Sequence, residues 1–220
     1  VTTNTIELTN LMPETEYEIF IQSDCGSGTG TYSSVVFTTN CLPFDVPFIE
    51  DFSSTSTTND CWTIVDNNAD GDAWDLDYGF NTLLGDEVAV LNTDFNGGSN
   101  DDYLITPGLN LTGNEQLRFS YRVQSSNEPN DFQITLSTSG TDVANFTNVL
   151  MPLDSYDNTV YEEVILDLSA FSGEAYIAFH VPSGGLDGWR LYIDDVNVEA
   201  IPACPTPLGL SVSNVLSNSV

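Results

Sequence analysis

The fold is decided by one short stretch, Leu117-Arg118-Phe119-Ser120-Tyr121-Arg122-Val123, in which apolar and polar side chains alternate. Alternation with a period of two is typical of a β-strand with one face in a core and the other in solvent. The four apolar side chains are therefore expected to point inward and the two Arg outward. Similar β-rich runs, separated by Gly, Asn, Asp, Ser and Pro, are residues 132–136, 164–166, 175–179 and 191–193. Helical periodicity is nearly absent, so the sequence predicts an all-β fold, an antiparallel β-sandwich.

The chain is strongly acidic, with 33 Asp or Glu, three Arg and no Lys, which gives a formal net charge of −30. Nucleic-acid binding and attachment to anionic lipid need clustered cations, which this composition does not supply. No apolar run approaches the ~20 residues needed to cross a bilayer, so direct membrane insertion is not expected. A carboxylate that points inward has almost no Lys or Arg to pair with, which makes a divalent cation its natural partner.

Two composition breaks divide the chain, one at Asn40-Cys41-Leu42-Pro43 and one in the Pro-rich residues 201–207. Punctuation of this kind is typical of joints between modules. The expected parts are residues 1–40, 41–201 and 202–220. The opening Val1-Thr2-Thr3 is neither a start Met nor a signal peptide with a basic region, so we expect a piece of a longer chain.

A motif near the start, Leu11-Met12-Pro13-Glu14-Thr15-Glu16-Tyr17, leads into a β-rich run. It resembles the L-x-P-x-T-x-Y stretch of fibronectin type III domains, in which the Tyr forms the corner before strand F. Residues 35–39 would then be strand G, and residues 204–212 resemble strand A of a following module. The resemblance implies partial fibronectin type III modules on both sides of the central part, as in a tandem array.

The central part carries several short motifs in order. They are FIEDF (48–52), CWTIVD (61–66), DGDAW (70–74), AVLNTD (89–94), YLITP (103–107) and LYIDDV (191–196). The ordered set resembles the MAM-like jelly rolls called cleaved-adhesin or choice-of-anchor J modules, which recur in secreted surface proteins of Bacteroidetes. The resemblance implies a jelly-roll β-sandwich over residues 41–201. It also implies a non-catalytic role in binding, in adhesion or beside an enzyme.

Four Cys in a chain of extracellular character suggest disulfide bonds, for which three complete pairings exist. Cys25 and Cys41 lie at opposite ends of an expected strand, much farther apart than the ~7 Å limit between bridged Cα atoms. The resemblance to MAM domains implies a Cys41–Cys61 bridge around the first jelly-roll strand. By analogy between the flanking modules, Cys25 and Cys204 pair outside this sequence and are unpaired within it. Four buried thiols are the alternative.

Two acids are expected on inward-facing positions of the first and last strands of the central part. Glu50 alternates in phase with two Phe, and Asp195 with the apolar residues of its own strand. These strands are commonly neighbours in jelly rolls, so the two carboxylates are expected to meet. Two buried anions without a cation cost several kcal/mol. The sequence therefore predicts a structural Ca²⁺ held by Asp195 with Glu50 or the adjacent Asp51.

Other acids offer further ligands for this ion. Because a β-bulge exchanges the two faces of a strand, Asp194 is an alternative to Asp195. Asp94 and the pair Asp101-Asp102 add hard oxygens, of which Ca²⁺ takes about six to eight. The competing interpretation is an acidic edge that is hydrogen-bonded and solvated.

A second candidate for a calcium site is the loop Asp66-Asn67-Asn68-Ala69-Asp70-Gly71-Asp72, which fits D-x-[DN]-x-[DN]-G. The spacing directs Asp66, Asn68 and Asp70 at one point, with Asp77 at the twelfth loop position. Strands rather than helices are expected on both sides, so the loop is not an EF-hand. The alternative is a plain turn, in which Asp and Asn are frequent.

Aromatic side chains near acidic loops offer platforms on which a sugar ring stacks. One platform comprises Trp74, Tyr78 and Phe80, and the other comprises Trp189 and Arg190. Burial in the core is the alternative for these aromatics, and it is the expectation for Trp62.

Enzyme activity is not expected. His180, the only His, lies in an expected strand and is interpreted as a packed or surface side chain. The chain has no G-x-S-x-G, H-E-x-x-H or phosphate-binding loop, and Cys in disulfides leave no thiolate nucleophile. The sequence indicates a non-catalytic, Ca²⁺-stabilised module, extracellular or on a bacterial cell surface, that binds a glycan or a surface protein. The alternatives are a structural spacer and, more distantly, a fragment of a hydrolase with a carboxylate pair.

Overall fold

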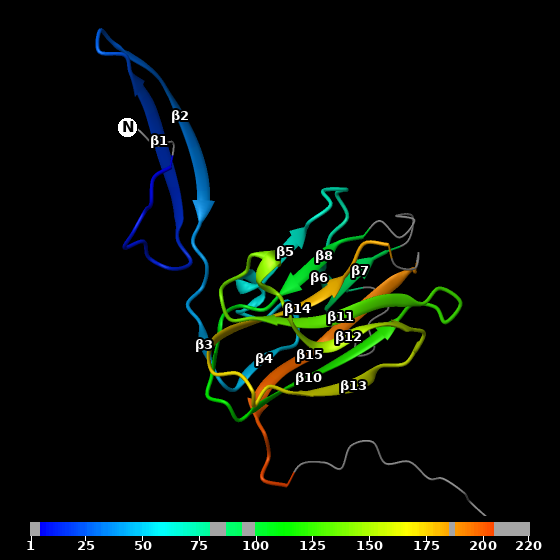
Figure 1. Ribbon diagram of the computed structural model, residues 1–220. Coiled ribbons are helices and arrows are strands. Elements are labelled where there is room, and N and C mark those ends of the chain that lie inside the picture. Colours follow the sequence, from blue (N-terminus) through cyan, green and yellow to red (C-terminus); the bar gives the residue numbers. More distant parts are fainter. Residues whose placement is uncertain (1–4, 80–86, 94–99, 185–187, 205–220) are drawn as a thin grey trace, which may run out of the picture.

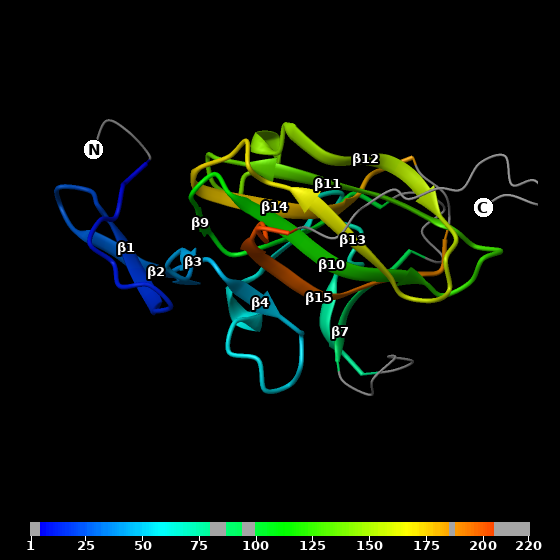
Figure 2. The same cartoon turned by 90° about the horizontal axis from the view of Figure 1, so that it is seen from below.

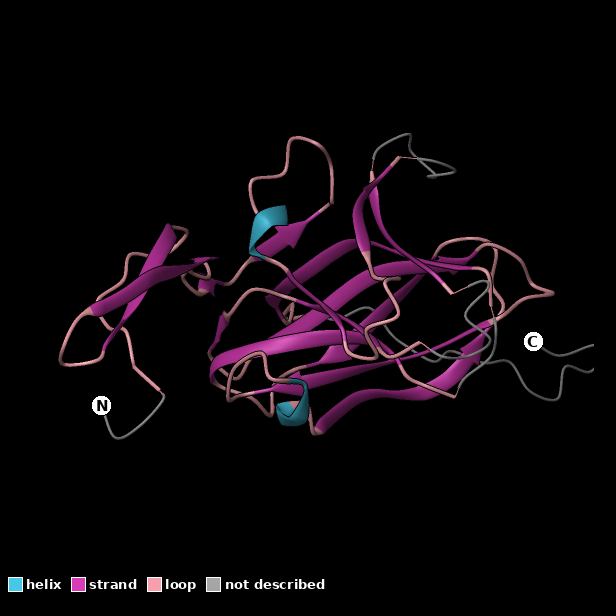
Figure 3. Cartoon of the chain, turned by 90° about the horizontal axis from the view of Figure 1, so that it is seen from above, coloured by secondary structure: helices cyan, strands magenta, loops and turns pink. Residues whose placement is uncertain are grey.

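The computed structural model describes residues 5–79, 87–93, 100–184 and 188–204. Within these ranges the chain forms β-strands and two single-turn 3₁₀ helices (Figure 3), η1 (Asn59–Cys61) and η2 (Val143–Asn145). The strands are β1 (Glu16–Asp24), β2 (Thr29–Thr38), β3 (Phe44–Asp45), β4 (Phe48–Glu50), β5 (Thr63–Asp66), β6 (Asp75–Tyr78), β7 (Val88–Asn92), β8 (Asp102–Ile105), β9 (Leu109–Leu111), β10 (Glu115–Val123), β11 (Asn130–Ser137), β12 (Asn148–Tyr156), β13 (Glu162–Asp167), β14 (Gly173–Val181) and β15 (Arg190–Ala200). The all-β prediction is confirmed.

Strands β1 and β2 pair with each other and form an antiparallel hairpin beside the sandwich (Figure 1). The hydroxyl of Tyr17 in β1 accepts a hydrogen bond of 2.8 Å from the backbone N–H of Met12. This bond ties the preceding loop to the strand, which is the task of the Tyr in the motif of residues 11–17. The assignment of residues 1–40 to a fibronectin type III module stays a prediction.

The other strands build two sheets that pack face to face (Figures 1 and 2). The six-stranded sheet has the order β13-β10-β15-β7-β6, and β4 pairs with β15 beside this path. The seven-stranded sheet has the order β12-β11-β14-β8-β5, with β9 paired to both β14 and β3. Among the described strands, only the contact between β3 and β9 is parallel. The antiparallel β-sandwich is therefore confirmed.

The core lies between the two sheets and is built by side chains in alternation. The four apolar side chains of residues 117–123 are all at most 5% exposed, as the alternation predicts. Phe119 packs edge-to-face on Phe179 of the facing sheet, with ring centroids 5.1 Å apart. Full burial of such a side chain stabilises the fold by roughly 1.5–3 kcal/mol. Trp62 also belongs to the core, as expected.

The first and last strands of the six-stranded sheet along the chain, β4 and β15, are neighbours. β4 runs antiparallel to β15, with Glu50 opposite Val196 and Phe48 opposite Val198. β15 contains a β-bulge, because Asp195 has a left-handed φ of 51° and the register against β10 shifts beside it. An extra residue in a strand moves the following side chains to the other face. The inward or outward direction of the acids in β15 therefore depends on this bulge.

A disulfide bond joins Cys41 to Cys61, with the Cα atoms 5.5 Å apart. The predicted pairing is confirmed. Cys25 and Cys204 are free and exposed. The bond fixes the segment that enters the sandwich to the end of η1, just before β5.

Candidate functional site

An acidic cluster, which we define as Asp66, Asp70, Asp101 and Asp102, lies where β5 ends and β8 begins. Asp66 is the direct register partner of Asp102 in the antiparallel pair β5–β8. Asp70 belongs to the loop after β5, and Asp101 immediately precedes β8. Strand pairing thus gathers acids that are distant in the sequence at one end of the seven-stranded sheet.

The loop after β5 is shaped by hydrogen bonds to its own carboxylates. The side chain of Asp66 accepts the N–H groups of Asp70 and Gly71 at 3.2 and 2.9 Å. Asp70 accepts the N–H of Asp72 at 2.9 Å and the amide of Asn68 at 2.8 Å. Gly71 has a φ of 93°, a conformation that residues with a Cβ rarely adopt. The structure therefore brings the predicted ligands Asp66, Asn68 and Asp70 into one loop.

Asp102 is the member of the cluster that needs a partner. Its side chain is fully buried, and neither carboxylate oxygen has a hydrogen-bond partner among the described residues. Burial raises the pKa of Asp102 to about 7, and the negative charges of Asp70, Asp66 and Asp101 act in the same direction. An unpaired buried carboxylate costs several kcal/mol unless it is protonated or meets a cation.

In the described part of the chain, the cationic side chains are engaged elsewhere, on the six-stranded sheet. Arg118 forms ion pairs with Glu163 and Glu199, Arg122 lies over the ring of Tyr192, and Arg190 lies over the rings of Tyr78 and Trp189. The sequence contains no Lys that would neutralise the acidic cluster instead.

The acidic cluster has the chemistry that Ca²⁺ prefers. This ion takes about six to eight oxygen ligands, mainly carboxylates, carbonyls and water. Asp102 supplies two buried oxygens without partners, and Asp66 and Asp70 stand close enough to raise its pKa. These three residues, with Asp101 beside them, offer oxygens of the kind that a divalent cation binds, although their carboxylate oxygens do not all lie within 4.8 Å of one another.

His180 packs next to the acidic cluster as a structural side chain. Its Nε2 lies 2.8 Å from Oδ1 of Asp101, its Nδ1 lies 2.9 Å from the amide nitrogen of Gln133, and its ring stacks on Tyr103 at 3.7 Å between centroids. Burial lowers the pKa of His180. With both ring nitrogens engaged, the imidazole holds Asp101 in place and is not poised as a general base.

At the seam between β4 and β15 the geometry differs from the prediction. Glu50 points inward and is 1% exposed, as expected, but its carboxylate is hydrogen-bonded. It accepts the N–H of Phe52 at 2.9 Å, the indole N–H of Trp62 at 3.2 Å and the hydroxyl of Thr58. The expectation that Asp195 shares this inward face is wrong, because the bulge leaves it exposed. The structure does not bring Glu50 and Asp195 together.

The remaining predicted ligands at this seam also have other roles. Asp51 is exposed and accepts the N–H of Ser53 at 3.0 Å. Asp194 is half-buried and accepts the N–H of Asp195 at 2.8 Å. Asp94 lies outside the described residues. The described geometry corresponds to the competing interpretation, a hydrogen-bonded acidic edge.

The two predicted aromatic platforms are rearranged. Trp74 is 4% exposed and belongs to the core, so its assignment to an open platform is wrong; its position after the loop turns the indole inward. Tyr78 joins the second platform instead. The guanidinium of Arg190 lies 5.4 Å from the ring of Tyr78 and 5.6 Å from that of Trp189. Phe80 lies outside the described residues.

A groove of about 610 Å³ lies along the open edge of the sandwich, where β5 ends the seven-stranded sheet and β6 ends the six-stranded one. We call it the edge groove. It is lined by Ser54, Ser56, Asn59, Asp60, Trp62, Ile64, Trp74, Asp75, Leu76 and Asp77. The sequence reasoning missed this groove, although an Ile on a solvent-facing position of an edge strand was a signal for it.

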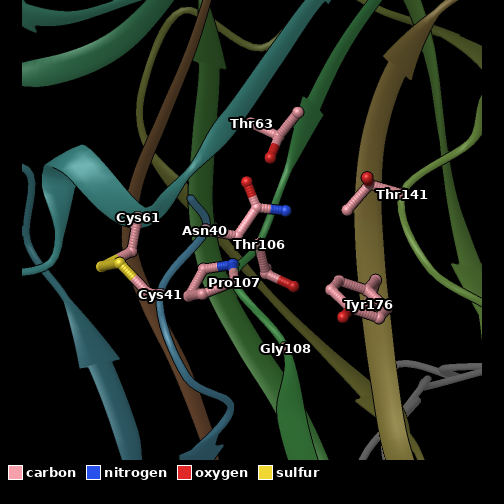
Figure 4. Close-up of a pocket in the computed structure, with 9 residues that line it drawn as sticks. All are labelled: Asn40, Cys41, Cys61, Thr63, Thr106, Pro107, Gly108, Thr141 and Tyr176. Atoms are coloured by element: carbon pink, nitrogen blue, oxygen red, sulfur yellow. A yellow bond between two sulfur atoms is a disulfide. The ribbon is translucent and has the colours of Figure 1, made fainter. Parts of the chain in front are cut away.

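A second cavity adjoins the disulfide (Figure 4), between Thr63, Thr106 and Tyr176. Its volume of about 20 Å³ holds little more than one water molecule. Glu14 has a carboxylate oxygen close to the sulfur atoms of Cys41 and Cys61, but sulfurs joined in a disulfide are not thiolate ligands. This corner is structural.

The fold defines a class, the antiparallel β-sandwich modules. Among the described residues no helix is long and apolar enough to span a bilayer. A model of the Cleaved Adhesin Domain family matches residues 46–198. The chain belongs to this family, as the ordered motifs predicted, and it is a non-catalytic adhesion module.

Curated relatives and solved structures agree with this assignment. Hemagglutinin A of Porphyromonas gingivalis is 32% identical in an alignment 173 positions long that covers 66% of this chain and 6% of the relative. Hemagglutinin A of strain ATCC BAA-308 / W83 is 33% identical in an alignment 175 positions long that covers 66% of this chain and 8% of the relative. The chain thus spans a small part of these proteins.

The cleaved adhesin domains K1 and K2 of Lys-gingipain show the same fold. K1, from P. gingivalis W83, has a TM-score of 0.58 at 22% identity, covering 70% of this chain and 98% of K1. K2 has a TM-score of 0.58 at 21% identity, covering 70% of this chain and 99% of K2.

Proposed function

We propose that this chain is a Ca²⁺-stabilised adhesion module of a secreted or cell-surface bacterial protein, and that it binds carbohydrate on the surfaces it meets. The family supports adhesion, and the name of the curated relatives, Hemagglutinin A, points to recognition of cell surfaces. Cell surfaces present both glycans and proteins. The platform of Tyr78, Trp189 and Arg190 favours glycan, because aromatic rings beside a cationic side chain stack on sugar rings and hold their hydroxyls.

The observation that carries the calcium part of the proposal is the buried carboxylate of Asp102. Both of its oxygens lack partners among the described residues, and it lies beside Asp66 and Asp70 without a cation. A Ca²⁺ ion bound there would join the end of β5, the following loop and the start of β8. Such an ion supplies positive charge and rigidity, and the residues themselves supply the oxygens.

The neighbouring parts of the chain fit a tandem array. The hairpin β1–β2 exposes large apolar side chains, including Phe20 at 59% and Val35 at 54%. One hairpin cannot bury such side chains on its own, and a two-sheet fibronectin type III module would cover them. We therefore propose that residues 1–40 and 202–220 belong to adjacent modules of this type.

The experiment that tests the proposed function combines glycan-array binding with thermal melting, each in calcium and in chelator. Saturable binding to glycans that chelator weakens, together with a lower melting temperature in chelator, is the expected result. Calcium-dependent melting without any glycan binding would instead favour the spacer. Equal melting temperatures in calcium and chelator would contradict the calcium part.

A matched pair of variants separates the acidic cluster from general charge effects. Asp102→Asn removes the buried carboxylate, whereas Asp142→Asn removes an exposed carboxylate that caps no helix by its side chain. Only the first variant is expected to lose the response to calcium. An equal loss in both variants would show that calcium acts by diffuse screening of the acidic surface.

A further inference from the structure

We propose that the edge groove is the carbohydrate site of this module and that its ligand is a neutral oligosaccharide. The proposal rests on the proposed function, carbohydrate binding, and locates it in a groove that shares only Trp74 with the predicted platforms. Its volume of about 610 Å³ lies in the range of sites that enclose small organic ligands. The groove lies between two sheet edges, so that walls from different strands face each other across it.

The base of the edge groove is apolar and accessible. Ile64 on β5 is 40% exposed, and Leu76 on β6 is half-buried against the core. Trp62 and Trp74 also line the groove, although each packs mainly in the core and is at most 7% exposed. Pyranose rings present C–H groups on their faces, and these groups pack against aliphatic and aromatic surface. The base therefore offers a strip along which a sugar chain gains contact area.

The walls of the groove carry hydrogen-bond acceptors. Asp60 comes from η1, and Asp75 and Asp77 come from β6, where both are exposed. Desolvation raises the pKa of Asp75. Hydroxyl groups of a sugar donate to carboxylates in charge-assisted bonds, which are about twice as strong as neutral ones. The amide of Asn59 donates only a long bond of 3.4 Å to Ser53, and its Oδ1 has no partner among the described residues. A small rotation of this amide would supply one more acceptor.

The charge of the walls selects against anionic ligands. Among the ten described residues that line the groove there is no Arg and no His, whereas three are Asp. Phosphate, sulfate and carboxylate groups are repelled by such a surface. The whole molecule is acidic, with a net charge of −30. A basic partner would therefore have no electrostatic reason to prefer the groove to the rest of the surface. The groove combines an apolar strip with acceptors on its walls, and a neutral polyol matches both features.

The groove shares its framework with the acidic cluster. The loop that contains Asp66 and Asp70 leads directly to Trp74 and Asp75 in the groove wall. The indole of Trp74 donates a hydrogen bond of 3.4 Å to the carbonyl of Asp102. Binding is therefore measured in the presence of calcium, so that this wall is held in place.

The test is isothermal titration calorimetry of the whole chain with short neutral gluco-, xylo-, manno- and galacto-oligosaccharides. An oligogalacturonate and an oligo-arginine peptide serve as the acidic and basic comparisons. We expect saturable binding of at least one neutral oligosaccharide. Ile64→Ala should weaken it by ~10-fold, because it removes apolar contact area. Asp77→Asn should weaken it by ~3- to 10-fold, because it leaves a neutral acceptor in place of a charged one. The matched controls Ile49→Ala, at an exposed position of β4, and Asp142→Asn should leave the affinity unchanged.

Three results would contradict the assignment of the carbohydrate site to the edge groove. They differ in what they say about the proposed function. Neutral binding that survives both groove variants but is lost in Trp189→Ala would keep carbohydrate recognition and move it to the aromatic platform. Binding of oligo-arginine alone, abolished by salt, would show a basic protein partner. If no probe binds while melting still depends on calcium, carbohydrate binding is contradicted. The chain is then interpreted as a structural spacer.

Discussion

Replacing Asp102 with Asn is expected to remove most of the stability that calcium gives to this chain. In the calcium-free protein, the buried carboxylate has a pKa of about 7 instead of 3.8. At about 1.4 kcal/mol for each pH unit, holding it ionised above neutral pH costs the fold roughly 4 kcal/mol. A bound Ca²⁺ removes this cost, so calcium should raise the melting temperature by about 10 °C for a chain of this size.

The direction of the pH dependence follows from the sign of the change in pKa. Because the pKa of Asp102 is higher in the folded state than in the unfolded chain, the folded state binds more protons between about pH 4 and pH 7. In chelator, this group therefore stabilises the fold less and less as the pH rises through that interval. In calcium the trend should disappear, since the ion favours the carboxylate over the acid.

The assay is thermal melting followed by circular dichroism, in chelator and in calcium, across this pH interval. Many other acids titrate as well, so the quantity that matters is the difference between the wild type and Asp102→Asn. The variant should be more stable than the wild type in chelator above neutral pH and should respond little to calcium. The exposed variant Asp142→Asn should behave like the wild type. Identical calcium responses in wild type and Asp102→Asn would refute the reasoning.

Three further predictions concern the framework. Replacing both Cys41 and Cys61 with Ala should lower the free energy of unfolding by about 3 kcal/mol in chemical denaturation, because the bridge closes a separation of 20 residues; an unchanged midpoint would contradict this. Glu115 is buried, and although burial acts to raise its pKa, hydrogen bonds from the hydroxyl and backbone N–H groups of residues 112–114 lower it overall. Its stabilising contribution is therefore present above about pH 4.5 and is lost as the pH falls through the lowered pKa. Glu115→Gln should flatten this part of the acid-unfolding curve. Identical curves for the variant and the wild type would contradict this prediction. Gly188→Ala would place a Cβ into the side chain of Asn130, which is 1% exposed, and should cost about 1–3 kcal/mol in urea denaturation; a neutral result would show that this contact is loose.

Much of the fold was predictable because strand patterns are local. The alternation of residues 117–123 predicts burial of the four apolar side chains, and the structure agrees at all four positions. Its prediction that Arg122 faces solvent is wrong, because this side chain packs over the ring of Tyr192 and is 9% exposed. The same parity rule succeeds for Glu50 and fails for Asp195. A bulge with a left-handed residue interrupts β15 just there, and a two-residue period carries no information about such an insertion.

The candidate sites were less predictable because they depend on pairing between distant strands. Asp66 and Asp102 were assigned from the sequence to different places, and the register of β5 against β8 makes them partners. That Asp102 is fully buried without a hydrogen-bond partner among the described residues follows from this packing and from no local motif. The edge groove likewise needs both sheet edges, and Ile64 and Leu76 belong to different sheets.

The pairing of β4 with β15 and the nearby disulfide determine how this sandwich responds to mechanical force. The chain enters beside Phe48 and leaves beside Val198, which lie opposite each other, so pulling on the flanking residues would peel the two strands apart bond by bond. The covalent link between Cys41 and Cys61 bypasses this weak point, because the load passes directly to β5 and residues 42–60 cannot be stretched out. Under oxidising conditions the disulfide therefore carries a load that would otherwise separate β4 from β15.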